Sequence, residues 1–285
     1  MAMLRLQYRF SIAFYNKHIR MLLIIAHHYD AEALWLYDTL NSEHTIPVTL
    51  LQPEALGVDY DISLYLTNNG QHESVVRFFN TGRHLKGSRI SYAINRLSYI
   101  DPIVWQHAAQ EEKTYAGNEL NAFFPAFLHA LPCALSNPIY NGSLYSDRNF
   151  VRRLADCLRR QGIEVHPLAL DPSGRLFRTF RDTPPTQLWW LICSGKAVLT
   201  PYGQETAACQ EKIKDCLLRY GCTETVELIF LKEKDHLVFF HASKAPALSL
   251  YGRQLIEMLI QQIKKTVQDD TIDGHTQRIP LTPAC

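Results

Sequence analysis

The chain has 285 residues, of which 47% are hydrophobic and 20% are charged, and its formal net charge is +1. This is an ordinary globular composition, and the length is enough for one large or two small domains. The near-neutral charge gives no electrostatic basis for binding nucleic acid or an anionic membrane, and the sequence lacks a run of about 18 apolar residues that would span one.

Residues 1–20 contain basic and aromatic side chains but no acidic one. They have neither the continuous apolar stretch nor the small-residue cleavage site of a signal peptide. We expect an N-terminal extension here, either a disordered arm or the product of an upstream translation start.

The seven cysteines are odd in number and irregularly spaced, and they form no C-x-x-C pair. This usage indicates a reduced, cytoplasmic protein with buried thiols. No metal site is predicted from it.

An apolar run at Met21–Ala26 predicts a strand that is buried on both faces. A helix is expected over residues 31–40, with Asp30 as its N-cap. Between them, His27 and His28 follow the carboxyl end of the strand, where open parallel sheets place their ligands. The two histidines are therefore candidate substrate-binding residues. The alternative is that one caps the helix and the other packs beneath it.

Further strands are predicted at residues 48–51 and 61–66, and a turn-prone Thr-Asn-Asn-Gly follows the second. The order strand, helix, strand, strand predicts a small parallel α/β unit. Another strand, within residues 87–97, ends at Asn95-Arg96. The Arg96 guanidinium is expected to grip a ligand carboxylate or phosphate, or else to pair with Glu111, Glu112 or Glu119.

The longest amphipathic helix is expected over residues 111–131, where Pro125 should kink or divide it. We assign its apolar face to a core rather than to a cofactor site. That face comprises Tyr115, Leu120, Phe123, Phe124, Phe127, Leu128 and Leu131. Tyr115 and Glu119 share one side of the helix at i, i+4 spacing.

A basic helix is predicted over residues 150–161, with Gly162 as its stop and a strand at 163–168. Its arginines form either a solvated face or a patch for an acidic peptide. They are Arg152, Arg153, Arg159 and Arg160. Residues 171–186 are a polar, proline-rich connector.

The second half of the chain predicts strands at 187–193 and 196–199 and a helix at 206–220. Two further strands, Val226–Phe230 and one starting at His236, form a hairpin with a charged turn, followed by a helix over residues 251–267. Polar side chains occupy the far end of this hairpin, where a strand holds them rigidly beside a loop. These candidate catalytic residues are Glu227, His241, Ser243 and Lys244.

The hairpin run Val-Glu-Leu…Phe-Phe-His-Ala-Ser-Lys-Ala-Pro resembles the end of an ATP-grasp ligase, of the type of the ribosomal-protein glutamate ligases and graspetide ligases. Residues 94–97, the helix with Tyr115 and Glu119, and Asn137-Pro138 also look like the N-terminal, pre-ATP-grasp domain of such proteins. The resemblance covers residues 21–170 and 187–265. From this resemblance we expect Arg96, Tyr115, Glu119 and Asn137 to contact the substrate, together with His27 and His28.

The resemblance implies an α/β fold with two domains. A pre-ATP-grasp-like parallel α/β domain would span residues 21–170. A reduced α+β, ATP-grasp-like domain would span residues 187–268, with a tail at 269–285. In the family, the hairpin carries acidic and asparagine ligands for magnesium-bound ATP, and His241 and Ser243 stand at those positions here.

The family also has a sub-domain with two lysines and a Gly-rich flap that hold the nucleotide phosphates, and only residues 171–186 fill that space. The sequence has no Gly-rich phosphate loop. Since phosphoryl transfer depends on cations that neutralise developing charge, we expect binding of ATP and Mg²⁺ to be lost, and no other cofactor.

We therefore expect a degenerate ATP-grasp homologue, more a pseudoenzyme than an enzyme, in a peptide or small-molecule biosynthetic pathway. It would bind a substrate or a catalytic ligase-type partner, and a homodimer is expected by analogy alone. Two alternatives stay open. One is an active carboxylate–amine ligase. The other is an enzyme in which His241, with the other hairpin candidates and the two N-terminal histidines, forms a new acid–base or metal site.

Overall fold

The computed structural model describes most of the chain between residues 21 and 272. The described ranges are 21–43, 46–66, 72–100, 105–137, 150–167, 188–194, 197–199, 207–219, 225–233 and 236–272. The predictions for residues 1–20, the turn at 67–70, the connector at 171–186 and the tail beyond residue 272 lie outside these ranges.

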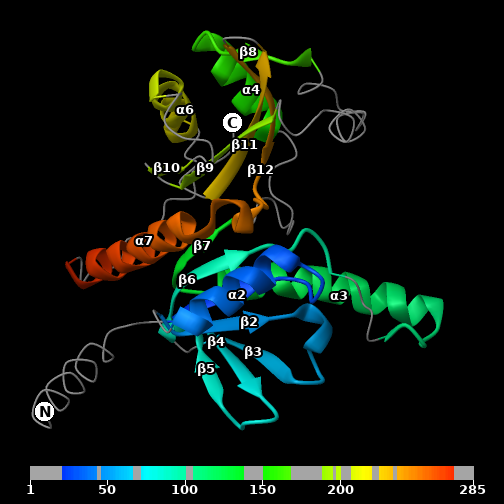
Figure 1. Cartoon of the computed structure of the whole chain (residues 1–285). Coiled ribbons are helices and arrows are strands. Elements are labelled where there is room, and N and C mark those ends of the chain that lie inside the picture. Colours follow the sequence, from blue (N-terminus) through cyan, green and yellow to red (C-terminus); the bar gives the residue numbers. More distant parts are fainter. Residues whose placement is uncertain are drawn as a thin grey trace, which may run out of the picture.

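A parallel sheet of strand order β2-β1-β6-β7 lies at the centre of the lower half of the molecule (Figure 1). Its strands are Met21–Ile25 (β1), Val48–Leu51 (β2), Ile90–Asn95 (β6) and Ala134–Ser136 (β7). The predicted strands at 21–26 and 48–51 are confirmed. Every β1 residue after Met21 is buried, as expected of a strand covered on both faces.

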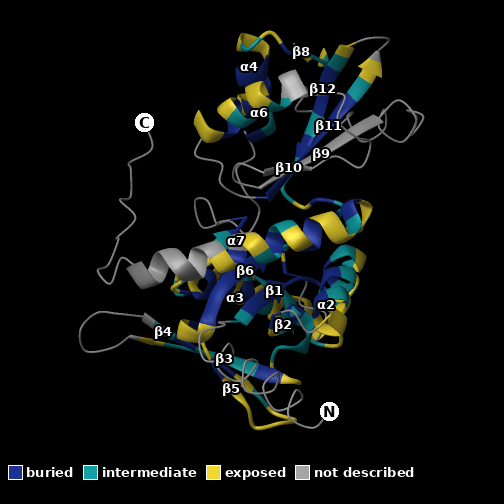
Figure 2. Cartoon of the chain, turned by 60° about the vertical axis from the view of Figure 1, so that its left-hand side comes forward, coloured by how far each residue is buried: buried dark blue, intermediate teal, exposed yellow. Residues whose placement is uncertain are grey.

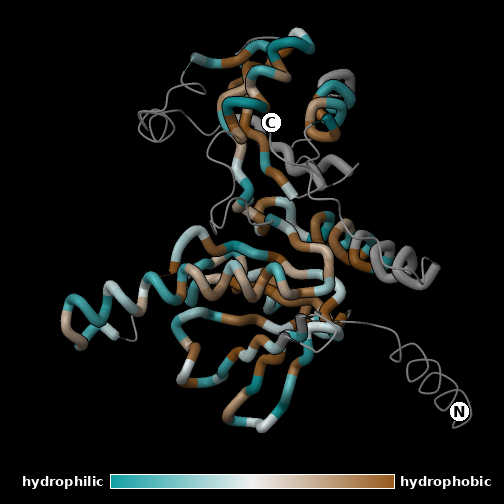
Figure 3. Tube along the Cα trace, turned by 180° about the vertical axis from the view of Figure 1, so that it is seen from behind, coloured by the Kyte–Doolittle hydropathy of each residue, from teal (hydrophilic) through white to brown (hydrophobic). Residues whose placement is uncertain are grey.

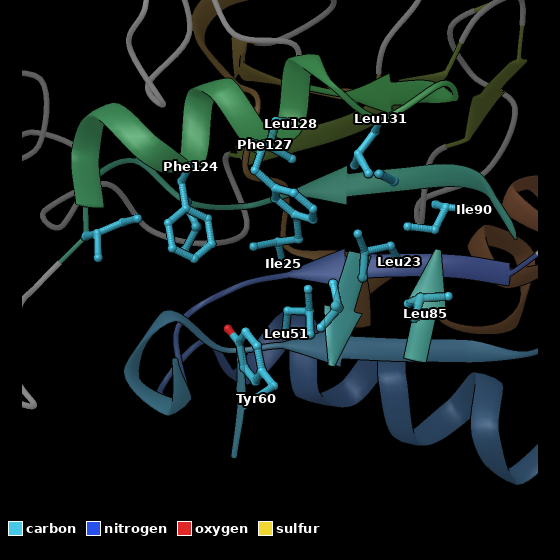
Figure 4. Packing of buried hydrophobic residues seen from close by; sticks show 14 of the residues in the cluster. Leu23, Ile25, Leu51, Tyr60, Leu85, Ile90, Phe124, Phe127, Leu128 and Leu131 are labelled. Carbon is cyan, nitrogen blue, oxygen red and sulfur yellow. The ribbon is translucent and has the colours of Figure 1, made fainter. Parts of the chain in front are cut away.

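The two faces of the parallel sheet pack into separate cores, because side chains alternate along a strand. Leu22 and Ile24 of β1 pack in one core with helices α2 and α7. Leu23 and Ile25 pack in the other with helix α3 and a small antiparallel sheet (Figure 4). The helices are Ala31–Glu43 (α2), Gln110–His129 (α3) and Gly252–Ile272 (α7).

The third predicted strand does not join the parallel sheet. Tyr60–Leu66 (β3) pairs in antiparallel register with His72–Phe78 (β4), which pairs in the same way with His84–Lys86 (β5). The connection between β3 and β4 spans only residues 67–71, which permits a hairpin but not the long crossover of a parallel pair. The prediction of a parallel unit is therefore wrong for β3.

Helix α3 is continuous although Pro125 lies inside it. Its start is fixed by Glu112, whose carboxylate accepts the backbone N–H of Ala109 at 3.1 Å. Pro125 is buried on the apolar side of the helix with Phe124 and Phe127. The expected division of this helix does not occur.

A second sheet, of order β10-β9-β11-β12-β8, forms the upper half of the molecule. Its strands are Glu164–Val165 (β8), Leu188–Ser194 (β9), Ala197–Leu199 (β10), Thr225–Glu233 (β11) and His236–Ser243 (β12). The predicted hairpin is confirmed as the antiparallel pair β11 and β12. Helices Phe150–Arg160 (α4) and Ala207–Arg219 (α6) pack against it and bury its centre (Figure 2).

The elements that pack together do not divide at residue 170, where a domain boundary is expected from the sequence. Gly162, with φ of 75°, turns the chain from α4 into β8, which pairs in parallel with β12 of the second sheet. The short 3-10 helix η6 (Leu248–Tyr251) and α7 return to the first sheet, where Leu255 and Leu259 pack beside Leu22. Each half of the molecule thus departs from the expected domains: α4 and β8 pack with the second sheet, and η6 and α7 pack with the first. In the described part of the chain, no helix is long and apolar enough to cross a membrane.

Candidate functional site

Arg96 lies at the end of β6, at the junction between the two halves of the molecule. Its side chain is only 6% exposed. The guanidinium donates to both carboxylate oxygens of Asp30, from Nε at 2.7 Å and from Nη2 at 3.2 Å, and Nη1 donates to the carbonyl of Pro246 at 3.0 Å. Asp30 also accepts the N–H of Ala33, as the predicted N-cap. The ion-pair partner of Arg96 is therefore Asp30, not Glu111, Glu112 or Glu119, and each of its three nitrogens donates a hydrogen bond within the chain.

Asn137 performs a similar joining role beside Arg96. It has a left-handed backbone, with φ of 58°. Its side-chain amide donates to the carbonyl of Asn95 at 2.8 Å and to the carbonyl of Lys244. Asn95 in turn donates to the carbonyl of Asn137 at 3.3 Å. The Asn137 side chain thus ties β6 to the segment that follows β12.

Replacing Asn137 should separate its two structural roles. Asn137→Gly keeps the backbone conformation but loses both side-chain hydrogen bonds, so we expect the free energy of unfolding to fall by about 2 kcal/mol. Asn137→Ala should cost about 1 kcal/mol more, because a Cβ without a local hydrogen bond disfavours this φ. Urea unfolding measures both values, and equal stability of the two variants would contradict the backbone argument.

Glu227 is buried within the hairpin, with 3% of its surface exposed. Its Oε1 accepts hydrogen bonds from the Tyr251 hydroxyl at 3.1 Å and from the Ala247 N–H at 3.2 Å. Burial raises the pKa of this carboxyl to about 7, and the two hydrogen bonds only partly oppose the shift. Glu227 therefore titrates near neutral pH while holding the turn into α7.

The hairpin register places three candidate residues on one face. Glu227 lies opposite Ser243, and Ile229 lies opposite His241. Leu228 and the other inward side chains of β11 point the other way, toward α4 and α6. Burial lowers the pKa of His241 and so favours its neutral imidazole. The Ser243 hydroxyl accepts the N–H of Ala245 at 3.1 Å and so caps the turn.

The side chains of Glu227, His241 and Ser243 do not fit the ligand set of a magnesium–nucleotide site. Magnesium ions are bound in proteins chiefly by carboxylate oxygens, together with the phosphates of a nucleotide. Glu227 supplies the one carboxylate among the three hairpin candidates, and it is engaged by Tyr251 and Ala247. His241 offers nitrogen, and the hydroxyl of Ser243 serves the turn.

Lys244 lies beside the same junction. Its ammonium group stands 4.7 Å from the centre of the Phe150 ring, within cation–π range. Arg96, Asn137 and Lys244, which are far apart in the sequence, line one small pocket together with Ser136, Thr225 and Pro246. The structure thus brings three of the sequence candidates together.

The two N-terminal histidines occupy a separate polar cluster after β1. His27 is buried and contacts Glu54 Oε1 through Nδ1 at 2.5 Å and the Tyr99 carbonyl through Nε2 at 2.9 Å. His28 is half exposed, and its Nδ1 lies 3.4 Å from the same carboxylate oxygen. Within the described ranges, no three His, Cys, Asp or Glu side chains gather as metal ligands. The hypothesis of a metal held by His27, His28 and His241 is therefore wrong.

Tyr115 and Glu119 lie on the outer side of α3. Tyr115 is 68% exposed, so its assignment to the apolar core is wrong. Glu119 is exposed as well. The amino-terminal half of this helix, which extends beyond the sheet, is largely hydrophilic (Figure 3), and periodicity alone could not show that the sheet ends before the helix does.

Several residues of the junction and of the histidine cluster could not be identified from the sequence. Glu32 at the start of α2 accepts the N–H of Ser249 at 2.7 Å and its hydroxyl at 2.9 Å. Glu54 and Tyr99 belong to the histidine cluster. None of these side chains follows a motif, because their partners lie far away along the chain.

The sequence matches no protein-family model and no curated protein. Solved structures do match in fold, and the three described below share 9–11% identity with this chain. The macrocyclase MdnC of Microcystis aeruginosa MRC, bound to the precursor peptide MdnA, gives a TM-score of 0.63 at 11% identity, covering 85% of this chain and 99% of MdnC.

Two further solved structures, both with peptide and nucleotide, also match. The RiPP-associated ATP-grasp ligase of Chryseobacterium gregarium, in complex with ADP and a leader and core peptide, gives 0.54 at 11% identity, covering 90% of this chain and 98% of that one. The ATP-grasp ligase PsnB, complexed with precursor peptide PsnA2 and AMPPNP, gives 0.54 at 9% identity, covering 88% and 98%. The chain has the ATP-grasp fold, as the hairpin motif predicts.

Proposed function

We propose that this chain is a non-catalytic protein of the ATP-grasp fold that binds a peptide in a peptide-modification pathway. It would hold a peptide or small-molecule substrate, or pair with a catalytic ligase-type partner. MdnC and PsnB support a peptide ligand, since both have this fold and both are seen with a precursor peptide.

The proposal rests on the identity, burial and hydrogen bonding of the hairpin side chains. Where the family has oxygen ligands for magnesium, this chain has His241, whose burial favours the neutral ring, and Ser243, whose hydroxyl caps a turn. The remaining carboxylate, Glu227, is buried and accepts two hydrogen bonds from the chain itself. This arrangement supports a structural use of the hairpin in place of phosphoryl transfer.

An assay of ATP turnover tests whether the protein lacks catalytic activity. With Mg²⁺, ATP and peptides containing lysine and glutamate, we expect ADP release by the protein to equal that of a protein-free control. The RiPP-associated ATP-grasp ligase of Chryseobacterium gregarium, whose structure holds ADP and a leader and core peptide, serves as a positive control with that peptide. Protein-dependent ADP release that disappears in Glu227→Gln would overturn the proposal and favour an active ligase.

Binding of a peptide is tested separately. A fluorescently labelled peptide encoded beside the gene should bind with a Kd in the range of about 1–100 μM, measured by anisotropy. Failure of every such peptide to bind would contradict the proposed peptide-binding role.

A cytoplasmic location and a homodimer belong to the same proposal. Cys133, Cys157 and Cys216 are not joined in a disulfide, which suits a reducing compartment. Dimerisation rests on analogy with oligomeric enzymes, and light scattering of the purified chain measures it.

A further inference from the structure

The small antiparallel sheet, at the bottom of the molecule in Figure 1, has two edges that differ in length and charge. β5, at one edge, is a strand of 3 residues, and its His84 and Lys86 are exposed. β3, at the other edge, has 7 residues and pairs with β4 in one continuous register. Natural proteins keep their edge strands short, charged or interrupted, because a long and regular edge is a template for another strand.

β3 also differs from the edge strands of the other two sheets. In the described part of the chain, these are β2 with 4 residues, β7 and β10 with 3 each, and β8 with 2. The sequence of β3, Tyr-Asp-Ile-Ser-Leu-Tyr-Leu, contains no lysine, proline or glycine. Its one charged residue, Asp61, is bonded to Arg77 of β4. The edge of β3 therefore lacks the short length, the lysine and the proline that elsewhere prevent pairing with another chain.

Alternate backbone groups of β3 point away from β4. The N–H of Phe79 donates to the carbonyl of Asp59 at 2.8 Å, so the odd-numbered residues of this strand bond to β4. The even-numbered residues face the free side, where the carbonyl of Tyr60 already accepts a backbone N–H at 2.8 Å. Beyond this contact, no strand among the described residues pairs with the N–H and C=O groups of Ile62 and Leu64. A further strand would satisfy these groups.

The side chains of β3 divide between the two faces of the sheet. Ile62 and Leu64 pack against the core that contains helix α3 and are partly buried there. Since side chains alternate along a strand, Asp61, Ser63 and Tyr65 lie on the outer face. Tyr65 is 54% exposed. A large aromatic side chain beside an open edge is a surface that a partner strand would cover.

We propose that β3 pairs in antiparallel register with β3 of a second copy of this chain, so that the small sheets of the two protomers join into one. The two-fold axis passes beside Ser63, which lies opposite the partner's Ser63. Ile62 then lies opposite the partner's Leu64, and the two exchange their N–H and C=O groups, as residues on the free side do. The inference rests on the proposed homodimer and names its interface.

The side chains of β3 suit a second copy in this register. Each contact occurs twice about a two-fold axis, so Ile62 meets the partner's Leu64 and Leu64 meets the partner's Ile62, both apolar pairs. On the outer face, Asp61 lies opposite the partner's Tyr65, whose hydroxyl can donate to the carboxylate. Like charges directly opposite each other would oppose pairing, and this register of β3 contains none.

Sedimentation equilibrium of the full-length protein, between about 1 and 200 μM, measures the association. We expect a monomer of 32.8 kDa in equilibrium with a dimer of twice that mass, with a Kd of about 10 μM. Ser63→Lys places two lysines opposite each other at the axis and should raise the Kd about tenfold or more. His84→Lys, which puts the same side chain on the protected edge strand β5, is the matched control and should leave the Kd unchanged.

A cysteine at the axis tests the register. Residue 63 forms a non-hydrogen-bonded pair with its own copy, at a Cα separation of about 4.5 Å that suits a disulfide. Ser63→Cys should therefore give a cross-linked dimer with oxidised glutathione, detected by gel electrophoresis without reductant. Tyr65→Cys should cross-link no more than the wild type with its 7 native cysteines, because the two copies of residue 65 would lie about 13 Å apart along the strands.

A wild type that stays monomeric at about 200 μM would overturn the inference together with the homodimer. A dimer that Ser63→Lys does not weaken, or that Ser63→Cys does not cross-link, would overturn the interface and leave the homodimer in place. If the chain is monomeric and Ser63→Lys weakens binding of the peptide encoded beside the gene, the edge receives a peptide strand and not a second copy. ADP release and peptide binding are measured separately, so the rest of the proposed function stands in each case.

Discussion

Replacing Arg96 with Met is expected to lower the free energy of unfolding by about 3 kcal/mol, because removing one partner of a buried ion pair leaves the other charge uncompensated. Arg96 is 6% exposed and Asp30 is 18% exposed, so water offers Asp30 little compensation. The variant also loses the donor to the Pro246 carbonyl. Urea unfolding, followed by tryptophan fluorescence, measures the change.

Two control variants make the result specific to the buried pair. Arg253→Met removes an arginine that is 79% exposed and pairs with Glu257 on the surface of α7, and it should change the stability by less than about 0.5 kcal/mol. Arg96→Met combined with Asp30→Asn should cost less than the sum of the single changes. A loss of under 1 kcal/mol in Arg96→Met would contradict the view that the buried charge of Asp30 depends on Arg96 for compensation.

Glu227 should make the stability of the protein depend on pH. Its pKa in the folded state is raised to about 7, against an ordinary value of 4.5 in an unfolded chain. The folded protein therefore binds this proton more tightly than the unfolded chain does. The stability that this tight binding contributes is fully present below pH 4.5 and is lost as the pH rises through about 7.

The comparison of wild type with Glu227→Gln isolates this contribution, because glutamine has no proton to bind. The free energy of unfolding of the wild type, relative to the variant, should fall by about 3 kcal/mol between pH 4.5 and pH 7.5. Urea unfolding at a series of pH values measures it. A constant difference across this range would show that Glu227 does not titrate as its burial requires.

The local elements were predictable because they depend on short patterns. The apolar run at Met21–Ala26 and the charged turn after Leu231 each specify a strand or a hairpin without reference to the rest of the chain. β4 was missed, since Ser74 and Val76 are the buried residues among its described side chains, at positions 73–78, and its alternation is therefore weak. Tyr115 was misplaced because a helix pattern does not reveal where the neighbouring sheet ends.

The tertiary partners could not be predicted in the same way. Arg96 and Asp30 lie 66 residues apart, and Arg96 and Pro246 lie 150 apart. Three acidic residues near Arg96 in sequence were plausible partners, and only the positions of α2 and the segment after β12 decide among them. Glu54 follows no motif at all, because its role arises from the way the loops after β1 and β6 meet.

Calorimetric titration with AMPPNP and Mg²⁺ tests the central claim most directly. PsnB, whose structure holds AMPPNP, is the positive control under the same conditions. We predict no heat of binding for this chain up to about 1 mM nucleotide, because Glu227, the carboxylate among the hairpin candidates, is buried and bonded to Tyr251 and Ala247. Saturable binding with a micromolar Kd that requires Mg²⁺ would contradict the account.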